Sequence, residues 1–410
     1  MAGSRGSTGF VEALECSRCA RRFPPDEIHN RCPCGGPLLA RYDLRGISKA
    51  VTRDEIRRRP RDMWRYRELL PLGNDGYMVS LQEGFTPIIP LGSLSRQLGL
   101  SEIHLKDEGQ LPTGTFKARG AAVGISKARE FDIGTVALAT AGNAGGAWAT
   151  YGARAHMEVH VVMPADAPEI HKKECLASGA HLYLVKGFIS DAGAVASEAC
   201  RRYGWFSVST FHEPYRVEGK KTLGFEIAEQ FGWEFPEVIL YPCGGGVGLI
   251  GIWKAFKELR EMGWVGKRAP RMVAVQSDGC APIVKAFLEG KKCSEPWPGP
   301  RTRADGLRVP KPLADFLILD AIEESGGCAV SVAEADIPRA MKWLAREEGI
   351  LACPEGATTL LALDRLRRSG WVGKGDRVLL LNTGSGLKYP RLIRGKAVTL
   401  EKGEEIRKKG

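Results

Sequence analysis

Short apolar segments alternate with longer amphipathic ones from Leu81 onward. Apolar runs such as "VHVV" and "VLLL" are nearly continuous, which is typical of parallel strands covered by helices on both faces. Strands that alternate with helices predict an α/β fold. We expect strands at "IHLKDE" from Ile103, "TVALAT" from Thr135, "EVHVVMP" from Glu158, "HLYLVKG" from His181, "EVILYPCGGG" from Glu237, "RMVAVQS" from Arg271 and "RVLLLNTGSG" from Arg377.

Three of these strands run into loops of unusual composition. Ligands of α/β folds collect at the carboxyl ends of the strands, so these loops are where a site is expected. "AGNAGG" places Gly142 and Asn143 just ahead of an alanine-rich helix, whose first N–H groups suit an anion. "NTGSG" places Thr383 and Ser385 between glycines, a pattern that also fits an ordinary turn.

The third loop, "CGGGVG", predicts a phosphate site. Glycines let the backbone approach a phosphate without obstruction by Cβ atoms, and free amides together with the helix dipole hold its charge. No Lys-Ser or Lys-Thr pair follows, which disfavours a nucleotide P-loop, and a dinucleotide fingerprint with its ribose-binding acid is not clear either. A cofactor with a single phosphate fits better, held by Gly244, Gly245, Gly246, Val247 and Gly248.

Lys117 stands in "LPTGTFKARG", between a small polar cluster and an arginine-glycine step. Taken alone, a lysine is most often an ordinary surface residue. A lysine that condenses with a carbonyl must be held away from bulk water, and pyridoxal phosphate needs one such lysine, one phosphate cradle and one partner for its ring nitrogen. Lys117 and the three loops together match this set.

Four cysteines in two close pairs occupy the first tenth of the chain, in "CSRC" and "CPC". Two thiolates on one tight turn hold a Zn²⁺ ion from one side, and a second pair completes a tetrahedron. Reduced thiols in a loop-rich arm are the alternative interpretation, and His29 is an alternative ligand. The expected ligands of this structural zinc site, which has no catalytic role, are Cys16, Cys19, Cys32 and Cys34.

Length, composition and charge narrow the class of protein. The 410 residues suffice for two domains, and 43% hydrophobic with 26% charged residues is an ordinary globular composition. The net charge of +11 could indicate a nucleic-acid partner, but acids are interspersed in the densest basic stretches, which disfavours one. No signal-peptide core and no apolar stretch of about 18 to 20 residues occurs, so we expect a cytoplasmic protein without membrane contact.

In combination, these motifs resemble the threonine synthase family of fold-type II pyridoxal-phosphate enzymes. The resemblance runs in order through "CSRC", "CPCGGPL", "EGFTPI", "PTGTFKARG", "AGNAGG", "EPYRVEGKKTLGFEI", "GGGVGLIG" and "LNTGSGLKYP". It implies a tryptophan synthase β-like fold with two three-layer α/β subdomains at 46–400, a zinc-ribbon-like segment at 1–45 and a charged tail at 401–410. It also implies a homodimer that acts on a small amino-acid substrate.

The resemblance assigns roles to the residues around the cofactor. Lys117 would hold pyridoxal phosphate as a Schiff base and act as acid and base. Asn143 would hydrogen-bond the ring hydroxyl, Thr383 would meet the pyridine nitrogen, and the loop from Gly244 to Gly248 would hold the phosphate.

On the substrate side, the resemblance implies that Thr140, Ala141, Gly142 and Asn143 lie near the substrate carboxylate. Arg216, with Lys220 and Lys221 nearby, would be a partner for a substrate phosphate. The implied reaction converts O-phospho-L-homoserine and water to L-threonine and phosphate.

Two departures from the family pattern leave other reactions open. "FKARG" stands where "FKDRG" is common, and "TAGNA" stands where "SSGNT" is common, which removes hydroxyls that help to bind the substrate. The alternatives are a serine or threonine dehydratase, a β-replacement enzyme similar to cysteate synthase, and a non-catalytic member that binds phosphate-bearing ligands.

Overall fold

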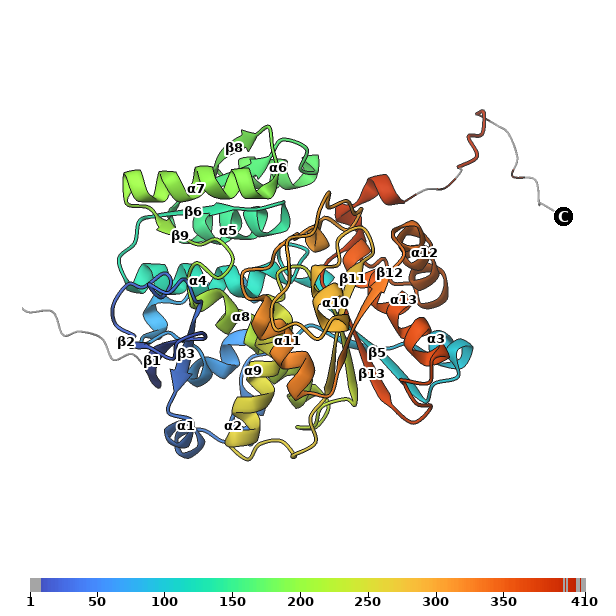
Figure 1. Cartoon of the computed structure of the whole chain (residues 1–410), viewed down its shortest axis with the longest axis horizontal. Coiled ribbons are helices and arrows are strands. Elements are labelled where there is room, and N and C mark those ends of the chain that lie inside the picture. Colours follow the sequence, from blue (N-terminus) through green and yellow to red (C-terminus); the bar gives the residue numbers. More distant parts are fainter. Residues whose placement is uncertain (1–8, 394, 396, 403–405, 407–410) are drawn as a thin grey trace, which may run out of the picture.

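The computed structural model of the chain describes residues 9–393, 395, 397–402 and 406, so most of the charged tail expected at 401–410 lies outside the described residues. Three β-sheets, with helices between and around them, make up the described part (Figure 1). None of the described helices is both long and apolar enough to cross a membrane.

The first sheet is small and antiparallel, with strand order β2-β1-β3. Leu14 and Ala40 pair across it and are fully buried. The two cysteine pairs lie at one end of this sheet, with Cys16 at the end of β1 and the other three cysteines in the turns after β1 and before β3. The elements are β1 (Val11–Cys16), β2 (Arg22–Phe23), β3 (Leu38–Tyr42), α1 (Leu44–Ala50) and α2 (Arg53–Arg58).

The largest sheet has six strands in the order β12-β11-β10-β13-β5-β4, and only β4 runs antiparallel to its neighbour. Side chains alternate between its faces, so Ile239 of β10 packs against α8 to α11 while Leu240 packs with α3, α12 and α13. The strands are β4 (Ile88–Pro90), β5 (Glu102–Asp107), β10 (Val238–Pro242), β11 (Arg271–Ser277), β12 (Cys328–Val332) and β13 (Arg377–Asn382). The helices are α3 (Gly92–Leu98), α8 (Tyr215–Gln230), α9 (Val247–Glu261), α10 (Pro282–Leu288), α11 (Asp315–Glu324), α12 (Ile337–Glu348) and α13 (Pro354–Arg368).

The third sheet has four parallel strands in the order β8-β7-β6-β9. Val162 of β7 packs against α7 on one face, and Val161 packs on the other face into the core that contains α5. Its elements are β6 (Thr135–Ala139), β7 (Glu158–Pro164), β8 (His181–Val185), β9 (Phe206–Ser207), α5 (Asn143–Arg154), α6 (Glu169–Ala177) and α7 (Ile189–Tyr203).

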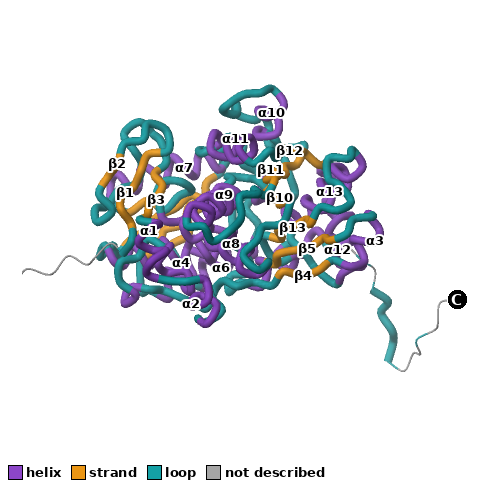
Figure 2. The backbone as a smooth tube through the Cα atoms, turned by 90° about the horizontal axis from the view of Figure 1, so that it is seen from below, coloured by secondary structure: helices purple, strands orange, loops and turns teal. Residues whose placement is uncertain are grey.

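Helix α4 (Lys117–Glu130) joins the parts of the molecule, because it packs against both α5 and α8. In Figure 2, α4, α8 and α9 lie between the first sheet and the six-stranded sheet. Arg119, in the first turn of α4, is fully buried and donates to Glu108 at 2.6 and 2.8 Å and to Glu226 of α8 at 2.5 and 2.8 Å. Lys106 of β5 also contacts Glu226, at 2.9 Å. Each of these buried charges thus has a partner of opposite sign, as burial requires.

All seven expected strands are present, and their parallel pairing under helices on both faces confirms the α/β prediction. The apolar pattern does not predict β4, β9 or β12, which have two to five residues and lie at the edges of their sheets. Parallel strands bring the loops after β6, β10 and β13 to carboxyl ends, where the candidate site residues lie.

Candidate active site

Lys117 is the first residue of α4, and the loop before it is fastened to the loop after β13. The Phe116 amide donates to the Thr383 carbonyl at 3.0 Å, and the Ser385 amide donates to the Gly114 carbonyl at 2.8 Å. Gly114 has a φ of +64°, which favours glycine at this turn. These bonds place Lys117 beside Thr383, although 266 residues separate them along the chain.

The amine of Lys117 lies in surroundings that disfavour its charge. The side chain is partly buried, and its Nζ lies 4.5 Å from the centre of the Phe116 ring. Burial, followed by the nearby Arg216 cation, lowers the pKa of Lys117 to about 8, while the Glu355 carboxylate acts in the opposite direction. Lys117 forms no ion pair with the described residues, so its amine is available to another group.

The glycine loop between β10 and α9 has a different constraint at each position. A Cβ atom on Gly244 would lie 2.1 Å from the Gly306 carbonyl oxygen, and one on Gly248 would lie 2.1 Å from the Tyr241 hydroxyl. Packing within the protein therefore requires both glycines. A Cβ atom on Gly245 would meet nothing closer than Thr210, at 3.5 Å. Space beside Gly245 at the start of α9 is what a phosphate group needs.

Two contacts link this loop to Lys117. The ring of Tyr241, which lies against Gly248, meets the ring of Phe116 edge to face at 6.3 Å. Thr210, the neighbour of Gly245, accepts a hydrogen bond from Arg216 at 3.1 Å. The loop after β10 and the start of α4 are therefore close neighbours, as a shared ligand requires.

Asn143, the first residue of α5, begins a chain of polar contacts. Its Nδ2 donates to the Tyr389 hydroxyl at 2.9 Å, which donates to Glu355 Oε1 at 3.0 Å, and the Gly306 amide donates to the same oxygen at 2.8 Å. The Oδ1 atom of Asn143 is buried and accepts no hydrogen bond from the described residues. An orphaned acceptor at this place fits a ligand that brings its own donor.

Glu355 and Tyr389 are site residues that the sequence interpretation missed. Tyr389 follows the "NTGSG" loop by only three residues and belongs to the longer motif "LNTGSGLKYP", so the sequence could have indicated that it lies near the site. Glu355 lies in the first turn of α13, and no pattern in the sequence marks it. Burial, reinforced by Glu355, raises the pKa of Tyr389 well above its ordinary value, so its hydroxyl stays protonated.

Thr383, directly after β13, has a cysteine side chain within hydrogen-bond distance. Its Oγ1 lies 3.6 Å from the sulfur of Cys353, which caps α13. Burial raises the pKa of the Cys353 thiol well above its ordinary value, so no thiolate stands next to Thr383. The hydroxyl is thus a neutral hydrogen-bonding group.

Two buried basic side chains of α8, Lys220 and Arg216, lie beside Lys117. Lys220 is 1% exposed and donates to the Phe116 carbonyl; burial, followed by the charges of Lys117 and Arg216, lowers its pKa well below the ordinary value. Arg216 donates to Thr210 and to a backbone carbonyl, lies 3.5 Å from Glu213, and has a buried Nε without a hydrogen-bond partner in the described structure. An anion bound here would pair with Arg216 and would favour the charged form of Lys220.

Lys221 does not belong to this group, so its expected place near the anion site is wrong. It lies 2.6 Å from Glu218 and 2.9 Å from Glu258, over the ring of Tyr42 of the first sheet. Adjacent residues on an α-helix point about 100° apart, so Lys220 and Lys221 face different neighbours.

The loop after β6 holds the residues expected near a substrate carboxylate. Thr140 is buried, and its Oγ1 accepts a hydrogen bond from the Gly142 amide at 3.0 Å; Ala141 between them is partly buried. Gly142 has a φ of +153°, and a Cβ atom there would lie 2.3 Å from the His171 ring. Glycine is therefore required where the loop enters α5.

The four cysteines of the first sheet converge on one point. Their sulfur atoms all lie within 4.8 Å of one another, with Cys16–Cys34, Cys19–Cys32 and Cys19–Cys34 separations of 3.5 Å. Sulfurs bound tetrahedrally to zinc at about 2.3 Å stand about 3.8 Å apart. The cluster could thus close around one ion without His29, which is not part of it.

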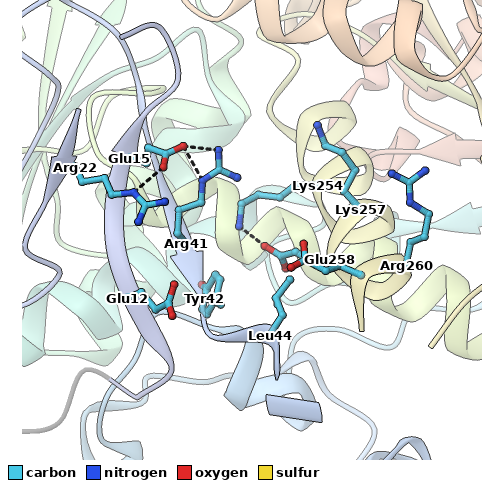
Figure 3. Close-up of a pocket in the computed structure, with 11 residues that line it drawn as sticks. Glu12, Glu15, Arg22, Arg41, Tyr42, Leu44, Lys254, Lys257, Glu258 and Arg260 are labelled. Atoms are coloured by element: carbon cyan, nitrogen blue, oxygen red, sulfur yellow. Dashed lines mark hydrogen bonds and ion pairs between the residues drawn. The ribbon is translucent and has the colours of Figure 1, made fainter. Parts of the chain in front are cut away.

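Two pockets flank these features. One, of about 450 Å³, lies between the loop that precedes Lys117 and the segment that follows β13. Its lining includes Thr113, Gly114, Ser385 and Lys388. Another, of about 610 Å³, lies between the first sheet and α9, away from Lys117 (Figure 3). Several of its charges are paired with one another, since Glu15 contacts Arg22 and Arg41 and Lys254 contacts Glu258 (Figure 3). The chemistry points to the Lys117 side rather than to the larger pocket.

Comparison with known proteins adds independent findings. The family model described as "Pyridoxal-phosphate dependent enzyme" matches residues 79–384. Threonine synthase of Methanocaldococcus jannaschii is 35% identical over 376 residues, which are 92% of either chain, and that of Methanosarcina acetivorans is 35% identical over 382 residues, 93% of either chain. The solved structure of maize serine racemase is 22% identical and shares the fold, with a TM-score of 0.66 over 80% of this chain and 94% of the other.

Proposed function

Since the chain belongs to the pyridoxal-phosphate dependent enzymes and, among them, to the threonine synthase family, we propose that it converts O-phospho-L-homoserine and water to L-threonine and phosphate. Membership makes the chain a pyridoxal-phosphate-dependent lyase; the substrate and the reaction are the proposal. The observation that carries the proposal is the pair of buried basic side chains, Lys220 and Arg216, next to Lys117. A substrate phosphate would accept hydrogen bonds from these two side chains and would favour the charged form of Lys220.

The residues present fit pyridoxal phosphate. We assign Lys117 to its aldehyde, the segment Gly244 to Gly248 to its phosphate, Asn143 to its ring hydroxyl and Thr383 to its ring nitrogen. Support comes from the space beside Gly245, the unsatisfied Asn143 Oδ1 and the lowered pKa of Lys117. When bound, the cofactor supplies an aldehyde for the substrate amine and a conjugated ring that stabilises negative charge at the substrate α-carbon.

Lys117 Nζ is the proposed proton carrier. With a pKa near 8, a useful fraction of the amine is neutral at pH 7 to 8 and accepts the proton of the substrate α-carbon. The same Nζ is the proposed base for one proton of Cβ, whose loss expels phosphate from Cγ, and the proposed acid that returns protons to Cγ and to Cα. Water supplies the hydroxyl group that is added at Cβ and gives up its remaining proton to the solvent.

Thr383 bears on which reaction follows. A neutral hydroxyl does not keep a ring nitrogen protonated as a carboxylate would, and Cys353 beside it is a neutral thiol. Negative charge at the substrate is therefore held less strongly, which favours elimination of a leaving group over reactions that need a long-lived carbanion. Thr140, Ala141 and Gly142 would face the substrate carboxylate from the loop after β6.

The decisive experiment incubates the purified holoenzyme with O-phospho-L-homoserine and measures inorganic phosphate and threonine. We expect equal amounts of both products and none with Lys117→Ala. Formation of a keto acid from L-serine or L-threonine in place of these products would make the protein a dehydratase, and transfer of an added nucleophile would make it a β-replacement enzyme. If the protein binds the cofactor but converts none of these substrates, it would be a non-catalytic member of the family that binds phosphate-bearing ligands.

The proposed binding site for the substrate phosphate can be tested separately. Lys220→Gln should raise KM for O-phospho-L-homoserine at least about tenfold, because each lost charge-assisted contact costs about 1.5 to 3 kcal/mol. Lys257→Gln, an exposed lysine on α9, is the matched control and should leave KM unchanged. Equal KM values for all three proteins would remove Lys220 from the substrate site.

We also propose that Cys16, Cys19, Cys32 and Cys34 bind one structural zinc ion and that the protein is a homodimer. The spacing of the four sulfurs supports the first assignment. Metal analysis should find that Cys34→Ser removes one zinc ion per chain from the protein. Light scattering should give twice the mass of the chain; the monomer mass would refute the dimer.

A further inference from the structure

A second group of metal-ligand side chains lies on the four-stranded sheet. Glu158 and His160 are two residues apart on β7, so they share a face, and His181 pairs with His160 in the parallel register of β8. All three lie near the amino ends of their strands. The loop after β6 that carries Thr140 lies at the carboxyl end of the same sheet, so this group is separate from the candidate active site.

The distances within the group match those of a bound transition-metal ion. Glu158 Oε1 lies 3.2 Å from His160 Nε2 and 3.1 Å from His181 Nε2, and the three ligand atoms all lie within 4.8 Å of one another. Nitrogen and oxygen ligands bound at about 2.0 to 2.1 Å in a tetrahedral zinc site stand about 3.3 Å apart. Little movement of Glu158 is therefore needed to admit an ion.

His160 is held as a ligand would be. It is 5% exposed, its ring stacks on Trp205 with 3.6 Å between centroids, and its Nδ1 lies 3.2 Å from the Tyr183 hydroxyl. With the Nδ1 proton donated to Tyr183, the lone pair of Nε2 is left for a cation. That Nε2 is buried and has no hydrogen-bond partner among the residues that the structure describes.

The other two side chains are supported and adjustable. Glu158 Oε2 accepts a hydrogen bond from Thr135 at 3.1 Å, which leaves Oε1 toward the histidines. The rings of His160 and His181 are stacked with 14° between their planes, so one ring must turn for both lone pairs to meet at one point. His181, whose side chain is 54% exposed, has the freedom to do so.

We propose that Glu158, His160 and His181 bind one divalent transition-metal ion of the Zn²⁺ type. Two imidazoles and one carboxylate select zinc and its neighbours over Mg²⁺ or Ca²⁺, which prefer oxygen ligands. Three protein ligands on an accessible surface leave one position for water. The ion would tie the edge strand β8 to β7, and because it binds the folded sheet, it would stabilise it.

Calorimetric titration of the full-length holoenzyme with ZnCl₂, after the cysteine cluster has been loaded, tests the site. The wild-type protein should take up one further Zn²⁺ per chain, and His181→Ala should bind it at least about tenfold more weakly. His181 is exposed and on an edge strand, so its removal leaves no cavity. His156→Asn, at an exposed histidine with a φ of +55° that asparagine tolerates, is the matched control and should bind as the wild type does.

Two further measurements make the result decisive. Tyr183→Phe should weaken the second Zn²⁺ about tenfold, since it removes the group that orients His160. Turnover should be the same in all variants, because the site lies at the opposite end of the sheet from the loop after β6. Wild-type protein without a second equivalent of zinc, or His181→Ala with undiminished affinity, would overturn the proposal.

Discussion

Lys117 takes its chemistry from its surroundings. An exposed lysine has a pKa near 10.4 and is almost wholly protonated at neutral pH. Burial and the Arg216 cation bring the pKa of Lys117 to about 8, so that about one amine in ten is neutral at pH 7. The Arg216 cation that would pair with a substrate phosphate thus also prepares the amine.

This coupling predicts a pH dependence. The rate at which cofactor-free enzyme captures added pyridoxal phosphate should rise with pH and level off above about 8, because only the neutral amine attacks an aldehyde. Absorbance after rapid mixing measures it. Arg216→Gln removes the neighbouring cation, so the rise should move to higher pH. A rise centred near the pKa of an exposed lysine in the wild type would contradict this account.

At the scale of elements, the glycines in the turn from β10 into α9 have different roles, because Gly244 is required for packing and Gly245 leaves space for a ligand. Gly245→Ala should leave the stability of the cofactor-free protein unchanged, because its Cβ meets nothing closer than 3.5 Å, and should weaken pyridoxal phosphate binding at least about tenfold, or about 1.4 kcal/mol. Gly244→Ala, the companion variant, should instead lower the free energy of unfolding by about 1 to 3 kcal/mol, since its Cβ would clash with the Gly306 carbonyl. Equilibrium titration and urea unfolding distinguish the two effects.

The contact between α4, α8 and β5 contains a group of buried, mutually paired charges. Removal of one of them leaves another buried without its partner. Despite the opposing effect of burial, Arg119 and Lys106 lower the pKa of Glu226 to about 2. Arg119→Ala would leave Glu226 and Glu108 short of their main partner, and we expect a loss of about 3 to 5 kcal/mol in the free energy of unfolding. Arg129→Ala, at the exposed end of the same helix, should change it by less than about 0.5 kcal/mol. Similar unfolding curves for the two variants would refute the argument.

At the scale of the whole molecule, the first sheet is packed onto the catalytic region through charge. The Tyr42 hydroxyl donates to Glu218 of α8 at 3.0 Å, and Lys221 and Lys254 lie over the Tyr42 ring. If a zinc ion holds the turns of this sheet, its loss should lower the stability of the whole protein as well as that of the turns.

Cys34→Ser should therefore release the metal and lower the melting temperature by at least about 2 °C, the shift expected for a loss of roughly 1 kcal/mol in a domain of this size. Scanning calorimetry with parallel metal analysis measures both quantities. Cys293→Ser, also at an exposed cysteine, is the control and should change neither. A melting temperature insensitive to metal would restrict zinc to a local role.

The local pattern of the chain determined the parallel strands, the loops at their carboxyl ends and the motif around Lys117. Apolar runs and glycine-rich turns act over a few residues, so they can be read directly along the sequence. Only the tertiary structure decided that Lys220 faces Lys117 while its neighbour Lys221 turns to Glu218 and Glu258.

The same holds for Glu355, which joins the site through Tyr389, and for His160 and His181, which meet because β7 and β8 pair in one register. The direction of a side chain depends on how its helix docks or how its strand pairs. Residues distant in the chain set that docking and pairing, so nearby letters do not reveal the partner of a buried charge. Sequence alone thus determined the helices, the strands and the reactive residues that they carry. Packing determined which side chains meet in one site.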